Sequence, residues 1–162
     1  MLSSLNGVAP SWSEIQITVN VTGGPTLTVI DIKSIDHESA VARGEQRGAS
    51  GGRVLKRTTG ALTNTASGEF YRDGAKALKR ELALVAPKDA GGRPQISKVS
   101  FDVIIKHSYD DDADIHCTKL LGCHYDKDGG KHAEGTDAET VTVDLNPIDI
   151  VETIDGQDTV LL

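Results

Sequence analysis

The sequence is poor in aromatic residues and in cysteine, and both shortages limit what the chain can be. Aromatic side chains make up 4% of the 162 residues, so a core has to be built from Val, Ile, Leu and Ala. Two cysteines are too few for a disulfide framework, which predicts folding in a reducing compartment. No stretch approaches the roughly 18 apolar residues of a membrane-spanning helix. The opening MLSSLNGVAPSW lacks the basic and apolar regions of a signal peptide, so none is expected.

The length and the charge distribution predict a single domain, spanning residues 1–162, with two electrically different halves. Residues 1–100 carry 13 basic and 9 acidic groups, a balance of +4, whereas residues 101–162 carry 4 basic and 15 acidic groups, a balance of −11. Together these make the net charge of −7. Such asymmetry fits a basic arm for nucleic acid, two patches that attract each other between copies, or two unrelated solvated faces.

Alternating apolar residues predict a mainly β protein, a barrel or sandwich of six to eight strands with one flanking helix. The clearest strand covers 14–21 and is joined to a second, 26–36, by the turn sequence TGGP. A change of parity near Val29 and Ile30 predicts a bulge or burial on both faces. The further strands are expected over 59–72, 96–109, 113–125 and 139–154.

One amphipathic helix is predicted over about 73–86. Asp73 can cap its start, and Pro87 ends it. The apolar residues Ala75, Leu78 and Leu82 fall on one face of such a helix. The helix is therefore expected to lie on a sheet.

A long basic loop is expected at 42–57, where ARGEQRGASGGRVLKR contains four glycines, five basic residues and one acid. Loops of this length inside a compact domain are uncommon and are usually functional or disordered. The segment is therefore predicted to act as an assembly loop between subunits, through Arg43, Arg47, Arg53, Lys56 and Arg57.

Both cysteines and three of the five histidines fall within residues 114–132, which raises the question of a metal site. In an extended strand, Cys117 and Cys123 would lie about 20 Å apart, too far for one zinc ion or a disulfide. The neighbouring His116 would also point to the opposite face of the sheet from Cys117. Only a tight turn at Gly122 could close the cluster, so the prediction is no metal ligand among these residues.

Other motifs with catalytic or binding potential are incomplete. Ser67 precedes Gly68 without forming a G-x-S-x-G elbow, and the glycine-rich residues 48–60 lack the spacing of a phosphate-binding loop. Asp126 and Asp128 resemble only the start of a calcium loop. No nucleophile, base and orienting group come together, so the sequence predicts no enzyme, no catalytic residue and no cofactor.

The order of these pieces resembles the tail tube proteins of long-tailed bacteriophages, which are related to the tube proteins of contractile injection systems and type VI secretion. The resemblance covers most of residues 14–156 and is one of order and pattern. It is carried by LTVIDIKSIDHESA, TTGALTNTASGEFYRDGAKAL, LLGCHYD and EGTDAETVTVDLNPIDIVETIDG.

The resemblance implies a virion subunit, made in the host bacterial cytoplasm, that forms usually hexameric rings stacked into a hollow tube for DNA delivery. It implies contacts with itself and with tail sheath, baseplate or tail-tip and terminator proteins, DNA passing without specific binding, and no membrane partner. The acidic segment 101–162 is expected to line the lumen or an interface. The candidates are Asp110, Asp111, Asp112, Asp114, Asp126 and Asp128.

Three interpretations from other classes remain open at this point: a metal-binding β-barrel enzyme, a monomeric ligand-binding β-sandwich, and a nucleic-acid-binding barrel. The last would use the basic 43–57 segment, but overall acidity and the shortage of aromatic stacking residues oppose it.

Overall fold

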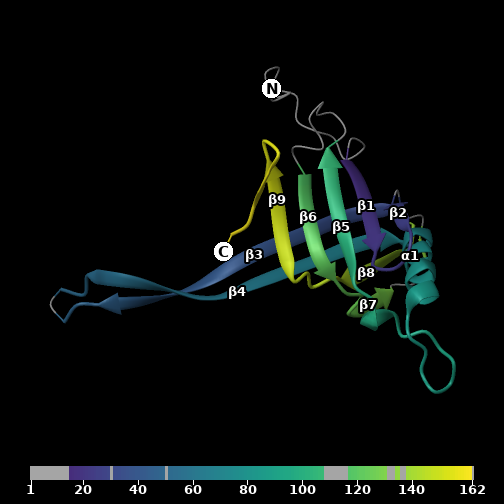
Figure 1. The fold of residues 1–162 in the computed structure, drawn as a ribbon, viewed down its shortest axis with the longest axis horizontal. Helices are drawn as coiled ribbons and strands as arrows, with labels where there is room; N and C mark the ends of the chain where they lie inside the picture. The colour runs from purple at the N-terminus through teal and green to yellow at the C-terminus, as the bar shows by residue number, and fades with distance from the viewer. Residues whose placement is uncertain are drawn as a thin grey trace.

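Two antiparallel sheets and one α-helix make up the computed structural model, which describes residues 15–29, 31–49, 51–107, 117–130, 134–135 and 138–161. The six-stranded sheet has the order β10-β9-β6-β5-β1-β2, and the four-stranded sheet has the order β3-β4-β8-β7 (Figure 1). The six-stranded sheet comprises β1 (Ile15–Val21), β2 (Thr26–Val29), β5 (Phe101–His107), β6 (Cys117–Cys123), β9 (Asp149–Ile154) and β10 (Gln157–Thr159). The four-stranded sheet comprises β3 (Ile32–Arg47), β4 (Val54–Tyr71), β7 (Lys127–Gly130) and β8 (Thr140–Asp144).

The first predicted hairpin is confirmed, because β1 pairs with β2 in antiparallel register across the TGGP turn. Gly23 in this turn has a φ of +78°, which a residue without a Cβ adopts readily. The expected second strand, 26–36, is divided, because β2 ends at Val29 and the chain enters the other sheet at Ile32. The change of parity near Val29 thus marks a crossing between sheets.

The segment predicted as a long loop at 42–57 is instead the outer part of a two-stranded ribbon, so that prediction was wrong. Strands β3 and β4 pair from Ile32↔Phe70 out to Arg47↔Val54, with register shifts on the way. The connection is short, and the Gly48 N–H donates to the Arg53 carbonyl at 2.9 Å. Alternating polarity could not reveal these strands, because both faces of the ribbon are exposed.

Helix α1 (Arg72–Val85) confirms the single predicted helix and lies against the four-stranded sheet (Figure 1). Asp73 does not cap it: Tyr71 occupies the N-cap position, and Asp73 lies in the first turn, where its charge suits the helix dipole. Gly74 brings the helix close to the chain before β3, and the Tyr71 N–H donates to the Asp31 carbonyl at 3.0 Å. This contact holds the start of the helix against the entry to β3.

Of the remaining predicted strands, 59–72 lies within the longer β4, whereas the described strands within 96–109, 113–125 and 139–154 are shorter than expected. The stretch 96–109 contains the 3₁₀ turn η3 (Ile96–Lys98) followed by β5, and 139–154 is split into β8 and β9. Asn146, with a φ of +39°, lies between β8 and β9. The short strands β2, β7 and β10, of three or four residues, raise the number of strands above the expected six to eight.

The core lies between the two sheets and beneath helix α1. The six-stranded sheet contributes Val19, Phe101 and Leu120, and the helix contributes Leu78 and Leu82, all nearly inaccessible to solvent. Phe70, Val143 and Leu145 close the core from the four-stranded sheet. A mainly β sandwich with one flanking helix is therefore confirmed. None of the helices in the described part of the chain has the length and apolarity needed to cross a membrane.

Candidate assembly surfaces

The ribbon formed by the outer halves of β3 and β4 projects away from both sheets (Figure 1). Beyond Val41 it is exposed on both faces and extends by about 20 Å, given ~3.3 Å per residue. Two-stranded ribbons of this kind are marginally stable alone. The ribbon is therefore a surface that a neighbouring molecule would stabilise.

All five basic residues predicted for assembly lie on this ribbon or at its turn: Arg43, Arg47, Arg53, Lys56 and Arg57. Glu45 is the one acid among them, and it accepts ion pairs from Arg47 at 3.0 Å and from Arg57 at 3.6 Å. The structure therefore places the five predicted basic residues on one element, and Val54 and Leu55 are exposed beside them.

The face of the four-stranded sheet that points away from the core is polar and rich in hydroxyl groups. The register places Ser67 between Asp36 on one side and Asp144 on the other, and the next row joins Glu69 to Thr142. These residues alternate along their strands with the core residues. The outward face is hereafter called the polar face.

The charges of the polar face are partly compensated. Lys33 pairs with Glu69 at 3.4 Å, and Lys127 pairs with Asp144 at 3.9 Å. The Thr140 hydroxyl donates to the Glu69 carboxylate at 2.8 Å and, with Lys33, holds the pKa of Glu69 below its ordinary value. The Glu69 carboxylate is therefore ionised at neutral pH.

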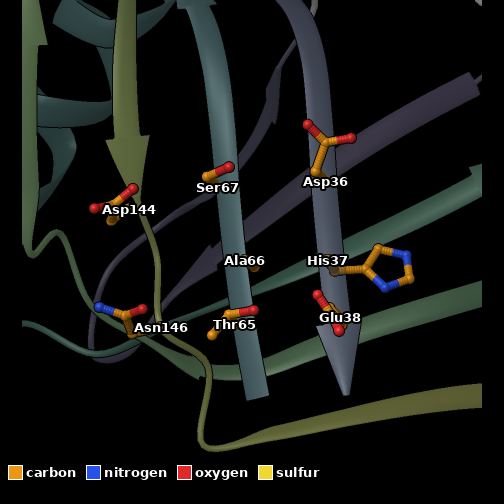
Figure 2. Close-up of a pocket in the computed structure, with 8 residues that line it drawn as sticks. All are labelled: Asp36, His37, Glu38, Thr65, Ala66, Ser67, Asp144 and Asn146. Carbon is orange, nitrogen blue, oxygen red and sulfur yellow. The ribbon is translucent and has the colours of Figure 1, made fainter. Parts of the chain in front are cut away.

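A hollow of about 440 Å³ crosses the polar face at the base of the ribbon. Figure 2 shows Asp36 and Glu38 on one side of it, Asp144 and Asn146 on the other, and Thr65 and Ser67 between them on β4. The small side chains on β4 account for the hollow, since the longer ones stand to either side. The sequence pattern did not group Asp36, Glu38 and Asp144. The alternation of residues over 65–69 indicates a strand with one outward-facing side, but it does not indicate which carboxylates lie beside that side.

Both edges of the four-stranded sheet are open in the described part of the chain. Strand β3 pairs only with β4, and β7 pairs only with β8. Strand β7 is exposed along its length, and Gly129 carries no side chain, so a second backbone can approach this edge closely. Unpaired strand edges of this kind are templates for pairing with another chain.

The acidic residues predicted for the lumen or an interface do not form one cluster among the described residues. Asp110, Asp111, Asp112 and Asp114 lie outside the described residues. Asp126 is exposed and accepts a hydrogen bond from the Asn146 side chain at 3.0 Å. Asp128 forms an ion pair with Lys79 of helix α1, and the Tyr125 hydroxyl donates to it at 3.3 Å. These last two carboxylates thus have local partners at the β7 side of the sheet.

The cysteines stand at the two ends of β6, and both are buried free thiols. Gly122 forms a bulge with a φ of +66°, and its N–H donates to the Asp102 carboxylate at 2.9 Å, so no tight turn closes the cluster. Burial, with the nearby Asp102 charge, raises the pKa of Cys123 to about 12. No group of three or more potential metal-ligating side chains occurs among the described residues; His116 and His132 lie outside them.

Comparison with solved structures identifies the fold. A chain in the extended sheath–tube complex of the PVC extracellular contractile injection system has a TM-score of 0.61, at 11% identity over 98% of this chain and 99% of that one. A chain of the anti-feeding prophage baseplate has a TM-score of 0.59, at 11% identity over 93% and 99%. A chain in the tail of an empty GTA particle with C6 symmetry has a TM-score of 0.52, at 12% identity over 95% of this chain and 100% of that one.

These likenesses, at nearly full coverage of both chains, confirm the tail-tube-like fold expected from the sequence. No protein-family model matches the sequence. No curated protein resembles it at a significant level.

Proposed function

We propose that this protein is the structural subunit of a phage-type tail tube, which forms rings of six that stack into a hollow conduit for DNA delivery. The observation that carries the proposal is the four-stranded sheet with two open edges, in a fold shared with chains of contractile injection systems and a tail particle. In this role the chain is a building block of a particle and has no catalytic function.

The directions of its strands allow the four-stranded sheet to close into a ring. Its four strands alternate in direction, so β3 and β7 at the two edges run antiparallel to each other. Under rotational symmetry about an axis along the strands, β7 of one copy therefore meets β3 of the next in antiparallel orientation. Such a heterologous contact closes into a ring and removes both open edges of the four-stranded sheet.

The polar face is the part of the sheet that suits the lumen. DNA carries one charge per ~1.7 Å of its axis, so a basic wall would bind it tightly and slow its passage. Asp36, Glu38 and the hydroxyl groups of β4 repel phosphate or contact it weakly. Asp126, Asp128 and the acidic residues of 110–114 remain candidates for the rim of the lumen or for subunit interfaces.

The partners follow from this role. A tube subunit contacts copies of itself within and between rings, and the tube ends meet baseplate or tail-tip and terminator proteins. In a contractile tail, a sheath surrounds it. The protein is then a component of the virion, made in the host cytoplasm, and DNA passes through it without sequence-specific binding.

Electron microscopy of the concentrated, purified protein tests the proposal directly. We expect rings or tubes with six-fold symmetry, and a Gly129→Pro substitution at the β7 edge is expected to abolish them, since proline blocks close strand pairing. The matched control is Ala90→Pro, in the exposed loop between α1 and η3, at the second position of the turn that the Gly92 N–H closes on the Asp89 carbonyl, where proline is readily accommodated. A wild-type protein that stays monomeric at every concentration would contradict the proposal.

DNA retention tests the lumen separately. Assembled tubes are expected to hold duplex DNA weakly even at low salt, because the conduit offers few cations for phosphate. The double variant Asp36→Lys/Glu38→Lys is expected to retain DNA at low salt and to release it as salt is raised. Tight, salt-sensitive binding by wild-type tubes would refute the assignment of the polar face to the lumen.

A further inference from the structure

Exposed apolar side chains gather on two separate hairpins. Eight large apolar side chains are exposed among the described residues, and five of them lie on these two elements. Val54 and Leu55 belong to the ribbon tip, defined here as residues 47–57. Ile154, Val160 and Leu161 belong to the β9–β10 patch, defined here as residues 149–161. Apolar groups concentrated in this way mark contact surfaces more often than scattered ones do.

The two elements carry opposite charges. The ribbon from Arg43 to Arg57 has five basic side chains and one acid, whereas the β9–β10 patch has four acids and no lysine or arginine. Within the patch, Asp158 is paired with Lys119 at 3.2 Å, and Glu45 offsets part of the ribbon charge. Both elements keep an excess charge, and the signs are complementary.

The tip and the patch of one chain cannot meet each other. Figure 1 shows the ribbon extending away from β9, with its turn far from the end of the described chain. Strand β10 is also an open edge of the six-stranded sheet. The complementary surfaces must therefore meet on different copies, in a heterologous contact that repeats from copy to copy.

We propose that the ribbon tip of one copy docks on the β9–β10 patch of a copy in the adjacent ring. This inference rests on the proposed tube function and names the contact by which the rings stack. Leu55 and Val54 pack against Ile154, Val160 and Leu161. Arg53 and Lys56 lie against the carboxylates of Glu152 and Asp155. The apolar contact supplies affinity, and the charges reject the like-to-like pairing of two tips.

Charge reversal with rescue tests the contact. The tip variant is Arg53→Glu/Lys56→Glu, which reverses the two tip cations that face the patch. The patch variant is Glu152→Lys/Asp155→Asn, in which asparagine is chosen because Asp155 has a φ of +52° that asparagine tolerates. A combined variant carries all four substitutions and places the lysine introduced at position 152 against the two introduced glutamates, which restores one ion pair with its signs exchanged.

The measured quantity is the protein concentration at which tubes form, from sedimentation velocity and electron microscopy. Each single-surface variant is expected to raise it about tenfold or more, as loss of close charge pairs does. The combined variant is expected to recover part of this loss, because it regains one of the two pairs of opposite charges. The control Arg80→Glu/Lys98→Glu, which reverses two exposed charges elsewhere, is expected to leave it unchanged.

The outcomes separate this contact from the function on which it rests. Far-ultraviolet circular dichroism and thermal melting establish that each variant is folded. If wild-type protein forms tubes and both single-surface variants do so at the same concentration, the docking contact is refuted while the tube function stands. Failure of the combined variant to recover also refutes the pairing. If wild-type protein never assembles, the tube function itself is wrong.

Discussion

Substituting Gly74 with alanine sets two physical effects against each other, and the structure predicts which one prevails. Gly74 is the one glycine of helix α1, and in an open helix its replacement by alanine is favourable by about 1 kcal/mol. Here an added Cβ would lie 2.5 Å from the Asp31 carbonyl oxygen and 2.9 Å from the Asp31 Cβ. The oxygen belongs to the backbone, so it cannot move aside as a side-chain end would.

The helix would have to shift to relieve that contact. The shift weakens the Tyr71 N–H to Asp31 hydrogen bond, which is worth about 1 kcal/mol. It also disturbs Leu78 and Leu82, and forcing extra volume into a packed core costs about 1–3 kcal/mol. After the gain in helix propensity is subtracted, we expect Gly74→Ala to lower the free energy of unfolding by about 1–3 kcal/mol.

Urea denaturation followed by circular dichroism measures this difference, at protein concentrations below assembly. The melting temperature should fall by about 2–12 °C, given roughly 2–4 °C per kcal/mol for a chain of this size. Lys76→Ala, at an exposed position of the same helix, is the control and should change stability by less than about 0.5 kcal/mol. A Gly74→Ala protein more stable than wild type would show that the close approach to Asp31 does not constrain the helix.

Three further predictions concern the core, the cysteines and the β9–β10 hairpin. Leu82→Ala should lower the free energy of unfolding by about 2–5 kcal/mol in the same urea experiment, because the Leu82 side chain is fully buried on the core-facing side of α1. A loss below about 1 kcal/mol would contradict that packing. Cys123, whose pKa is raised to about 12, should resist alkylation near pH 8 until the protein unfolds, and chelators should not change the melting temperature; bound stoichiometric zinc would refute this. The hydrogen bond from the Thr153 hydroxyl to Asp158 at 2.7 Å, with Lys119, lowers the pKa of Asp158. The stabilisation that the ionised Asp158 contributes is therefore present at neutral pH and is lost as the pH falls through that lowered pKa. Asp158→Asn should flatten this acid dependence of the melting temperature, and an unchanged dependence would count against the role of Asp158.

The strands with one buried face could be predicted from the sequence. In 14–21, Ile17 and Val19 alternate with polar residues, and the structure buries them as β1. The helix was equally predictable, because Ala75, Leu78 and Leu82 repeat at helical spacing. In both cases one face of the element contacts the core, so the buried apolar residues recur along the sequence with the period of the strand or of the helix.

The ribbon could not be predicted in this way, and its prediction as a loop was wrong for a definite reason. Residues 42–61 have no face against the core, so neither glycine nor charge is excluded from any position. Their strand character comes from cross-strand pairing between β3 and β4, which here joins residues 7 to 16 apart, from Arg47↔Val54 to Arg43↔Thr59. Pairing between two strands that are exposed on both faces leaves little trace in local composition.

The sequence by itself determined that the chain is a mainly β protein, a barrel or a sandwich, with one helix, and that its charge is divided along its length. Only the tertiary structure decided which charges are neighbours. Asp36, Ser67 and Asp144 became one row of the polar face through the register of three strands. Asp128 instead forms an ion pair with Lys79 of helix α1. Surfaces of a sheet are assembled across strands, and the partner of each residue is set by register, which no single segment of the sequence contains.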